Sequence, residues 1–244
     1  MDMFDLTGKR ALVTGSTQGI GFAIARVLAE HGAEVFVHGG TSLEKCEKAA
    51  AQIPGAKAVL APLNDHNCAD TLYAATGTLD ILVLNASVQI RKPWQKITEE
   101  EYDTVLDVNL RSTLSLIQKY APEMQERKWG RILCVGSVQE FRPHKDMLMY
   151  AAGKCAMQSM VRNLGKQLAP DGVTINNLCP GVIDTPRNSG ALSDPAYAKQ
   201  VYAGIPMAYA GIPEDCAGAA LLFCSDAGRY ITGAELVIDG GMQL

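Results

Sequence analysis

The chain has 244 residues, of which 48% are hydrophobic and 20% are charged, so it can bury a sizeable core. Its net charge of −4 gives no global basic field, and we expect no nucleic-acid partner. No apolar run approaches the length of a membrane span, and the first ten residues lack the order of a signal peptide, so we expect no membrane partner.

Strands and helices are predicted to alternate along the chain. The strands are expected at 10–14, 34–38, 56–62, 79–86, 130–137, 173–181 and 235–239. The helices are expected at 20–32, 43–53, 65–76 and 98–127, around Tyr150, and at 213–226, with a capping box of Thr98 and Glu101 on the fourth. This alternation predicts an α/β fold with a mainly parallel sheet and helices on both faces, in a single domain over 1–244.

Residues 183–212 break this alternation. The segment has scattered glycines and prolines and three tyrosines, Tyr197, Tyr202 and Tyr209. A stretch this long without a clear element is more often functional than plain loop. We therefore predict a substrate lid over about 183–212.

The cysteines and histidines do not form a metal-binding pattern. The seven cysteines are odd in number and scattered, none forms a C-x-x-C pair, and the four histidines are scattered as well. This usage is typical of reduced core residues, so we expect a cytoplasmic protein without a disulfide frame or a bound metal. A metal-dependent alcohol dehydrogenase needs clustered ligands and is excluded on that ground.

The turn after the first strand is rich in glycine. Gly15, Gly19 and Gly21 stand between the strand and the helix that follows, where glycine permits a tight turn and close approach of a ligand. The positive end of that helix favours a pyrophosphate. A tight strand-to-helix connection without a ligand is the alternative interpretation.

A tyrosine and a lysine are set four residues apart, at Tyr150 and Lys154, so a helix places both on one face. An ordinary phenol titrates near pH 10, too high for a base at neutral pH. A positive charge about 4 Å away at an effective dielectric of about 20 stabilises a phenolate by roughly 4 kcal/mol. The pair can therefore serve as a general acid and base.

These motifs together resemble the short-chain dehydrogenase/reductase family over nearly the whole chain. The match rests on Gly-x-x-x-Gly-x-Gly after Thr14, on Tyr150-x-x-x-Lys154, and on Asn85 and Ala86 of "LNAS", where Leu84 and Ser87 depart from the family pattern. The resemblance implies a Rossmann-type doubly wound sheet of about seven strands and catalytic residues Asn109, Ser137, Tyr150 and Lys154. It implies cofactor contacts from Thr14, Gly15, Ser16, Thr17, Gln18, Gly19, Ile20, Gly21, Gly39, Gly40, Thr41, Ser42, Asn85, Ala86, Ser87, Tyr150, Lys154, Pro180, Gly181, Val182, Ile183 and Thr185.

The resemblance also implies a mechanism. Tyr150 exchanges a proton with the substrate oxygen, Ser137 hydrogen-bonds that oxygen, and Lys154 also binds the nicotinamide ribose. Asn109 holds a water that links Lys154 to solvent. An asparagine inside a helix is unfavourable by propensity, which independently favours a functional role for Asn109. The cofactor carries the hydride.

The substrate is expected to be small and anionic. Arg91, Arg142 and His144 follow predicted strand ends, where ligands collect in such sheets. Sugar acids or sugar derivatives are the preferred class, a 3-oxoacyl group on a carrier protein is the closest alternative, and a non-catalytic sensor or scaffold is a hypothesis of another class. The candidate substrate contacts are Arg91, Gln139, Arg142, His144, Met147 and Tyr202.

NADP is favoured over NAD, which stays possible. NAD enzymes usually end the second strand with an acid that binds the ribose 2′-hydroxyl, and Gly39 stands there. NADP enzymes usually supply an arginine, but Gly40 and Gln18 occupy those positions. Thr41 and Ser42, at the head of the next helix, could bind a 2′-phosphate instead.

A homotetramer is expected from the resemblance. Family members usually pair the long helix around 100–127 and the Tyr150 helix across one interface, and the C-terminal strand across another. Leu110, Leu114, Ile117 and Val161 are then predicted to be shared between subunits.

Overall fold

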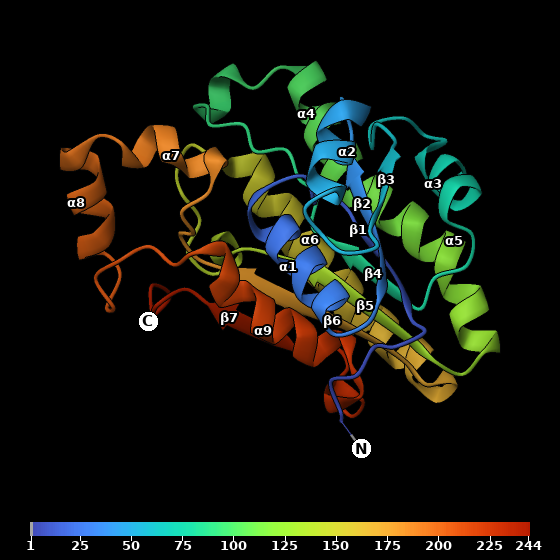
Figure 1. The fold of residues 1–244 in the computed structure, drawn as a ribbon. Helices are drawn as coiled ribbons and strands as arrows, with labels where there is room; N and C mark the ends of the chain where they lie inside the picture. The colour runs from blue at the N-terminus through green and yellow to red at the C-terminus, as the bar shows by residue number, and fades with distance from the viewer. Residues whose placement is uncertain (1) are drawn as a thin grey trace.

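The structure, a computed structural model, describes residues 2–244. Within these residues, seven parallel strands form one sheet in the order β3-β2-β1-β4-β5-β6-β7, which confirms the predicted Rossmann-type doubly wound sheet (Figure 1). The strands are β1 (Arg10–Val13), β2 (Glu34–Gly39), β3 (Lys57–Leu60), β4 (Ile81–Leu84), β5 (Gly130–Val135), β6 (Val173–Pro180) and β7 (Glu235–Ile238).

Helices cover both faces of the sheet. The α-helices are α1 (Gly19–Glu30), α2 (Leu43–Ala50), α3 (Cys68–Thr76), α4 (Glu99–Leu106), α5 (Ser112–Glu126), α6 (Leu148–Leu168), α7 (Pro186–Leu192), α8 (Pro195–Ala203) and α9 (Pro213–Cys224). A π-helical turn, η2 (Asp107–Arg111), joins α4 to α5. Short 3₁₀ turns are η1 (Trp94–Lys96), η3 (Val138–Glu140), η4 (Ala169–Asp171) and η5 (Asp226–Gly228).

Alternation along each strand divides the core into two layers. Val13 and Val83 pack with α1, α2 and α9 on one face, while Leu12 and Leu82 pack with α3, α5 and α6 on the other. Both faces of β4 and β5 are buried, as expected for the interior of a parallel sheet. The carboxyl ends of the strands therefore meet at one edge, between two helical layers.

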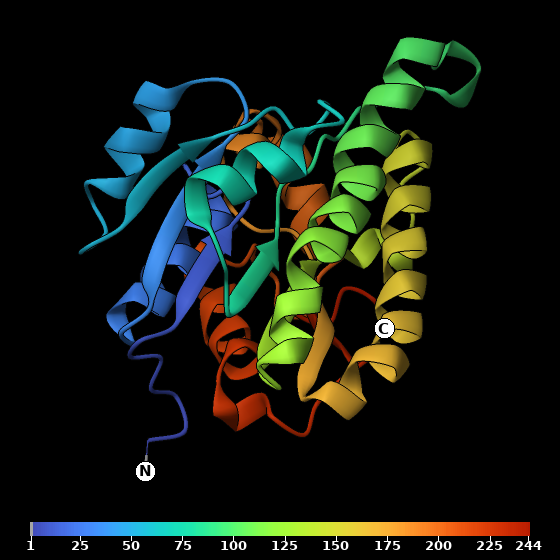
Figure 2. The same cartoon turned by 90° about the vertical axis from the view of Figure 1, so that its right-hand side faces the viewer.

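The predicted long helix over 98–127 is interrupted. Its capping box is present, but an extra residue enters the helix at η2, and the turn contains Asn109. In Figure 2 the helix formed by α4, η2 and α5 runs beside α6, and both α4 and η2 contact α6. Single π turns of this kind often occur at functional sites.

Two of the residues predicted to be shared between subunits belong to the subunit core instead. Ile117 is 3% exposed and Val161 is 1% exposed, and both pack beneath the sheet. That prediction was wrong because helical periodicity identifies an apolar face but not what covers it. Leu114, at 38% exposure, is free to meet another chain, and Leu110 is half-buried.

The irregular segment over 183–212 contains two short helices, α7 and α8, which extend to one side of the sheet (Figure 1). Each helix has a proline in its first turn, Pro186 and Pro195, where the missing N–H costs no hydrogen bond. The two ends of the segment are tied together by a bridge between Ile183 and Gly211.

Among residues 2–244, no helix is long and apolar enough to cross a membrane.

Candidate active site

A cleft of about 930 Å³ opens where β1, β4, β5 and β6 end. It is lined by nearly all of the residues predicted for the cofactor, the substrate and catalysis. The predicted residues that do not line it are Thr14, Ser16, Ser42, Asn109 and Tyr202. One cleft thus joins residues from most of the length of the chain.

The glycine-rich turn forms the floor of this cleft. Gly15 has a φ of +63°, and a Cβ there would lie 2.8 Å from Ala86 Cα, so only glycine fits. A Cβ on Gly21 would lie 2.4 Å from Asn85 Nδ2. Helix α1 starts beside the turn, and its N-cap residue Gln18 makes no side-chain capping bond. The first N–H groups of α1 are therefore available to an anion.

Thr14 and Ser16 hold this turn in place from behind. Thr14 Oγ1 accepts hydrogen bonds from the N–H groups of Asn85 (3.0 Å) and Ala86 (3.1 Å). Ser16 Oγ donates to Val13 O at 2.6 Å and accepts from the N–H of His38 at 2.9 Å. Both residues are almost fully buried, so they position the cofactor floor and do not line it.

His38 is a further part of this support that the sequence did not identify. Burial lowers the pKa of His38, which keeps the imidazole neutral. Nδ1 accepts from the N–H of Gly15 at 3.1 Å, so Nε2 carries the proton and donates to Ala61 O at 2.9 Å. The ring therefore couples the first glycine of the turn to the chain after β3.

Tyr150 and Lys154 lie one turn apart on α6, and both are buried, at 6% and 2% exposure. Lys154 Nζ lies 5.6 Å from the centre of the Tyr150 ring and donates to Val135 O at 2.5 Å. The ammonium thus has a fixed place beside the phenol, at the end of β5.

Ser137 stands at the end of β5 and is the N-cap of η3. Its Oγ accepts from the N–H of Gln139 at 3.2 Å, and its own N–H donates to Glu140 Oε1 at 2.8 Å. Because the Gln139 N–H occupies an acceptor position on the hydroxyl, the Ser137 O–H can serve as a donor. A capping role and a catalytic role are compatible here.

Asn109 reaches the site indirectly. Its Oδ1 accepts from the N–H of Val88 at 2.8 Å, and its Nδ2 donates to Val88 O at 2.9 Å. The side chain is 1% exposed. Asn109 therefore fixes the chain that follows β4, where Ser87 and Val88 line the cleft.

A basic and aromatic group stands at the mouth of the cleft. Arg91 Nη2 lies 3.3 Å from His144 Nε2 and donates to the hydroxyl of Tyr197 at 3.2 Å. Tyr197, on α8, lines the cleft in place of the predicted Tyr202. Both are half-buried tyrosines of one helix, and sequence spacing alone did not distinguish them.

Two of the predicted substrate residues are held by the protein itself. Gln139 Oε1 accepts from the N–H of His144 at 2.6 Å, and Arg142 Nη1 donates to Met242 O at 2.6 Å. Lys92, near the same rim, is ion-paired with Glu101 at 2.7 Å. Among the described residues, Arg91 is therefore the predicted arginine at the mouth that is bound neither to a backbone carbonyl nor to a carboxylate, and it lies beside His144 and Tyr197.

The segment over 183–212 is connected across the cleft. Arg187 on α7 donates to Ser87 Oγ (3.0 Å) and to Ser87 O (2.7 Å), while Tyr197 on α8 contacts Arg91. These bonds join the two short helices to the chain after β4. Residues of both helices line the cleft, and Arg187 is a contact that the sequence did not predict.

The far end of the cleft, beyond β2, is open. A Cβ on Gly39 would lie 2.7 Å from Cys46 Sγ, whereas a Cβ on Gly40 would find its nearest neighbours at 3.8 Å. Ser42 caps α2 by accepting from the N–H of Lys45 at 3.3 Å, so its hydroxyl has a structural role.

Comparison with known proteins agrees with this geometry. The model of the family described as Enoyl-(Acyl carrier protein) reductase matches residues 15–243. The chain is 34% identical to "3beta-hydroxysteroid dehydrogenase 1" of Eggerthella lenta, covering 98% of this chain and 95% of that protein. It is 32% identical to "5-keto-D-gluconate 5-reductase" of Escherichia coli K12, covering 99% and 98%.

A solved structure gives the same answer. A 3-oxoacyl (acyl-carrier-protein) reductase from Agrobacterium tumefaciens C58, determined with NADP bound, superposes with a TM-score of 0.92 at 36% identity, covering 98% of this chain and 96% of that one. The parallel sheet and the order of the motifs thus agree with the sequence relationship. The chain belongs to the short-chain dehydrogenase/reductase family and is an NAD(P)-dependent oxidoreductase that acts on CH–OH groups.

Proposed function

We propose that this enzyme interconverts a small hydroxy acid of the sugar-acid class and its keto form, with NADP as the preferred cofactor. The observation that carries the proposal is the Arg91 guanidinium at the mouth of the cleft, beside His144 and Tyr197. A guanidinium with further hydrogen-bonding side chains beside it is suited to a carboxylate. The relative named as a 5-keto-D-gluconate 5-reductase supports the same substrate class.

The proposed chemistry uses the buried pair on α6. In reduction, Tyr150 gives its proton to the substrate oxygen, and in oxidation it takes that proton back. The Lys154 ammonium, held at Val135 O, stabilises the phenolate that forms. Ser137 donates its O–H to the same substrate oxygen. The nicotinamide, when bound, supplies or accepts the hydride.

The residues at the floor of the cleft fit such a cofactor. The turn over 14–21 presents uncapped N–H groups at the start of α1, which would hold the pyrophosphate. Thr185, whose Cγ2 lies near Gly19, and Pro180 with Gly181 would hold the nicotinamide end. Lys154 would also contact the nicotinamide ribose. Asn109 supports this end by fixing the position of Val88. We also propose that Asn109 holds a water that links Lys154 to solvent.

NADP is preferred in this proposal because β2 ends without a carboxylate. Gly39 and Gly40 place no carboxylate at the end of β2, near the expected position of the adenosine ribose, and only Glu44 in the first turn of α2 partly opposes a 2′-phosphate. The hydroxyl of Thr41, which lines the cleft, is a candidate partner for that phosphate. The solved relative with NADP bound supports this preference.

A 3-oxoacyl group on a carrier protein is the second candidate. The cleft volume of about 930 Å³ leaves room for an acyl chain, and the solved relative carries that name. A sensor without turnover is disfavoured because Ser137, Tyr150 and Lys154 are all present in one cleft.

The experiment is a panel of sugar acids, neutral ketoses and 3-oxoacyl thioesters, followed by nicotinamide absorbance with NADP and NAD. The proposal expects the highest kcat/KM for a keto acid or its hydroxy form, with NADP. A higher kcat/KM for a thioester, or for a neutral ketose of the same length, would contradict the substrate class.

The chain is further proposed to act as one catalytic domain with residues 183–212 as a lid. The contacts Arg187–Ser87 and Tyr197–Arg91 support this role, since both connect the segment to the opposite wall of the cleft. Substrate would then protect α7 and α8 from backbone hydrogen exchange. Equal exchange of these helices with and without substrate would contradict the lid.

The proposed assembly is a homotetramer in the cytoplasm. Exposed apolar side chains on α4, α5, α6 and β7 support subunit contacts, among them Tyr102, Leu114, Leu148 and Leu236. Seven free cysteines, six of them buried, support a reducing compartment. Light scattering tests the assembly, and a monomer mass at working concentration would contradict it.

A further inference from the structure

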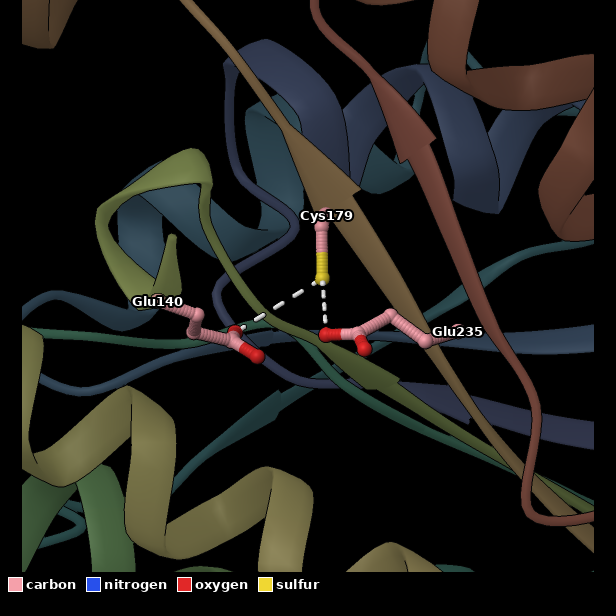
Figure 3. A group of neighbouring side chains, drawn as sticks. All are labelled: Glu140, Cys179 and Glu235. Atoms are coloured by element: carbon pink, nitrogen blue, oxygen red, sulfur yellow. Dashed lines mark hydrogen bonds between the residues drawn. The ribbon is translucent and has the colours of Figure 1, made fainter. Parts of the chain in front are cut away.

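Behind Ser137 lies a group of two half-buried carboxylates and a buried thiol: Glu140 from η3, Cys179 from β6 and Glu235 from β7 (Figure 3). One carboxylate oxygen of each glutamate and the Sγ atom of Cys179 all lie within 4.8 Å of one another. Cys179 Sγ is 3.4 Å from Glu235 Oε1 and 3.7 Å from Glu140 Oε1. Burial raises the pKa of the Cys179 thiol, which keeps it protonated and able to donate.

Glu140 is the member that reaches the active site. Its Oε1 accepts the N–H of Ser137 at 2.8 Å, and its Oε2 accepts from Asn177 Nδ2 at 3.0 Å. The carboxylate packs so closely on the backbone that a Cβ on Gly136 would lie 2.1 Å from Oε1. The residue before Ser137 thus leaves room for this carboxylate, which fixes the backbone that carries the Ser137 hydroxyl.

Two ionised carboxylates in such a place would repel each other. Burial, followed by the neighbouring Glu235, raises the pKa of Glu140 to about 7. The positive groups around the pair are unevenly placed. Arg162 lies 3.4 Å from Glu235 and Gln158 also donates to it, whereas Lys154 acts on Glu140 only through its charge. Cys155, on α6, donates from Sγ to Glu140 O and carries no charge as a thiol.

We propose that Glu140 is a positioning residue for Ser137 and that it holds the serine through one proton shared with Glu235. With the proton in place, Glu140 donates to Glu235 and still accepts the Ser137 N–H. Loss of the proton leaves two negative carboxylates side by side. Their repulsion moves Glu140 away from Glu235, and the hydrogen bond that holds the N–H of Ser137 is weakened. Glu140 touches neither substrate nor cofactor in this scheme, and the proposal rests on the role of Ser137 proposed above.

A bound cation is the alternative occupant of this group, since two carboxylates and a thiol are chemically able to hold one. The hydrogen bonds favour the proton. Both oxygens of Glu140 and one of Glu235 already accept N–H groups, and the thiol donates to the remaining Glu235 oxygen.

The first test follows unfolding of the protein without substrate. Glu140 with a pKa above its ordinary value contributes stability that is present below about pH 4.5 and is lost as the pH rises through about 7. Glu140→Gln removes this loss, so its melting temperature should gain on the wild type by about 3 °C or more between pH 5 and pH 8. The matched control, Glu126→Gln at the exposed end of α5, should follow the wild type at every pH.

The second test follows kcat against pH on any substrate that is turned over. The wild type should lose activity as the pH rises through about 7, and this limb should vanish in both Glu140→Gln and Glu235→Gln, because either variant leaves at most one carboxylate. Glu140→Leu, which cannot hold the Ser137 N–H, should lower kcat about tenfold at all pH values with unchanged cofactor affinity.

The outcomes are distinct. Any one of three results would overturn the proposal. The loss of kcat above about pH 7 could persist in both Glu140→Gln and Glu235→Gln, or the melting temperature of Glu140→Gln could change with pH in the same way as that of the wild type. The third is one bound cation per subunit by elemental analysis. Wild-type turnover by Ser137→Ala would instead refute the role of Ser137, and the melting comparison would then still test the shared proton.

Discussion

The two ends of the cleft are built in different ways. At the inner end, formed by β5 and α6, the side chains are buried and hydrogen-bonded: Lys154 is tied to Val135 O, and Ser137 to Gln139 and Glu140. At the outer end, beyond β2, Gly39 and Gly40 provide backbone only. Substitutions at the inner end therefore affect both the chemistry and the packing. Substitutions at the outer end can change which cofactor is preferred without disturbing the sheet.

Removal of the phenol hydroxyl should give the largest effect. Tyr150→Phe keeps the helix and the buried ring but has no proton to exchange, so kcat should fall by about 10³-fold or more. Cofactor affinity, measured by nicotinamide fluorescence, should stay within about twofold of the wild type, since the ring packing is retained. Near-normal turnover would refute the assignment of the acid and base.

Lys154→Met should affect both binding and rate. The substitution removes the charge beside the phenol and leaves Val135 O without its donor in a buried place. We expect kcat to fall about 10²-fold, weaker cofactor binding, and a lower melting temperature. Unchanged cofactor affinity by titration would exclude contact between Lys154 and the nicotinamide ribose.

The inner end is also the part that the sequence predicts best. Continuous apolar runs predict β4 and β5 as strands buried on both faces, and the spacing of Tyr150 and Lys154 places them together on α6. The π turn at η2 was not predicted, because a single extra residue barely disturbs the apolar spacing on either side. In the structure this turn contains Asn109, whose side chain accepts a hydrogen bond from the N–H of Val88.

Contacts between distant segments account for the other omissions. The helices α7 and α8 are short and begin with prolines, which in the sequence indicate loop as readily as a first turn. Glu140 and Glu235 meet only because both side chains reach Cys179 on β6, and no local pattern predicts that pairing. The same holds for the bond between Arg187 and Ser87.

Arg91→Ala tests the mouth of the cleft and should give a smaller effect. Loss of the guanidinium should raise KM for an anionic substrate about tenfold with little change in kcat, because the reacting atoms lie elsewhere. Lys92→Ala is the matched control, since Lys92 is already paired with Glu101. A neutral substrate should be indifferent to both changes. Equal effects of Arg91→Ala on charged and neutral substrates would contradict binding of a carboxylate.

The outer end allows the mildest change, an exchange of one cofactor for another. Gly39→Asp is a poor choice for this purpose, because the new Cβ would lie 2.7 Å from Cys46 Sγ and 3.1 Å from Thr17 Cγ2. An aspartate there would displace α2 as well as meet the ribose. Gly40 has its nearest neighbours at 3.8 Å and lines the cleft, so it accepts a side chain without strain.

Gly40→Arg should therefore increase the preference for NADP. A guanidinium near the expected 2′-phosphate adds a charge-assisted contact worth about 1.4 kcal/mol or more, which is about tenfold in the ratio of kcat/KM for NADP to that for NAD. Gly218→Ala, in an open position on α9, is the control for a glycine substitution far from the cleft. Because the arginine acts on the phosphate alone, kcat/KM with NAD should change little. A rise in kcat/KM for both cofactors together would show that residue 40 does not face the adenosine ribose.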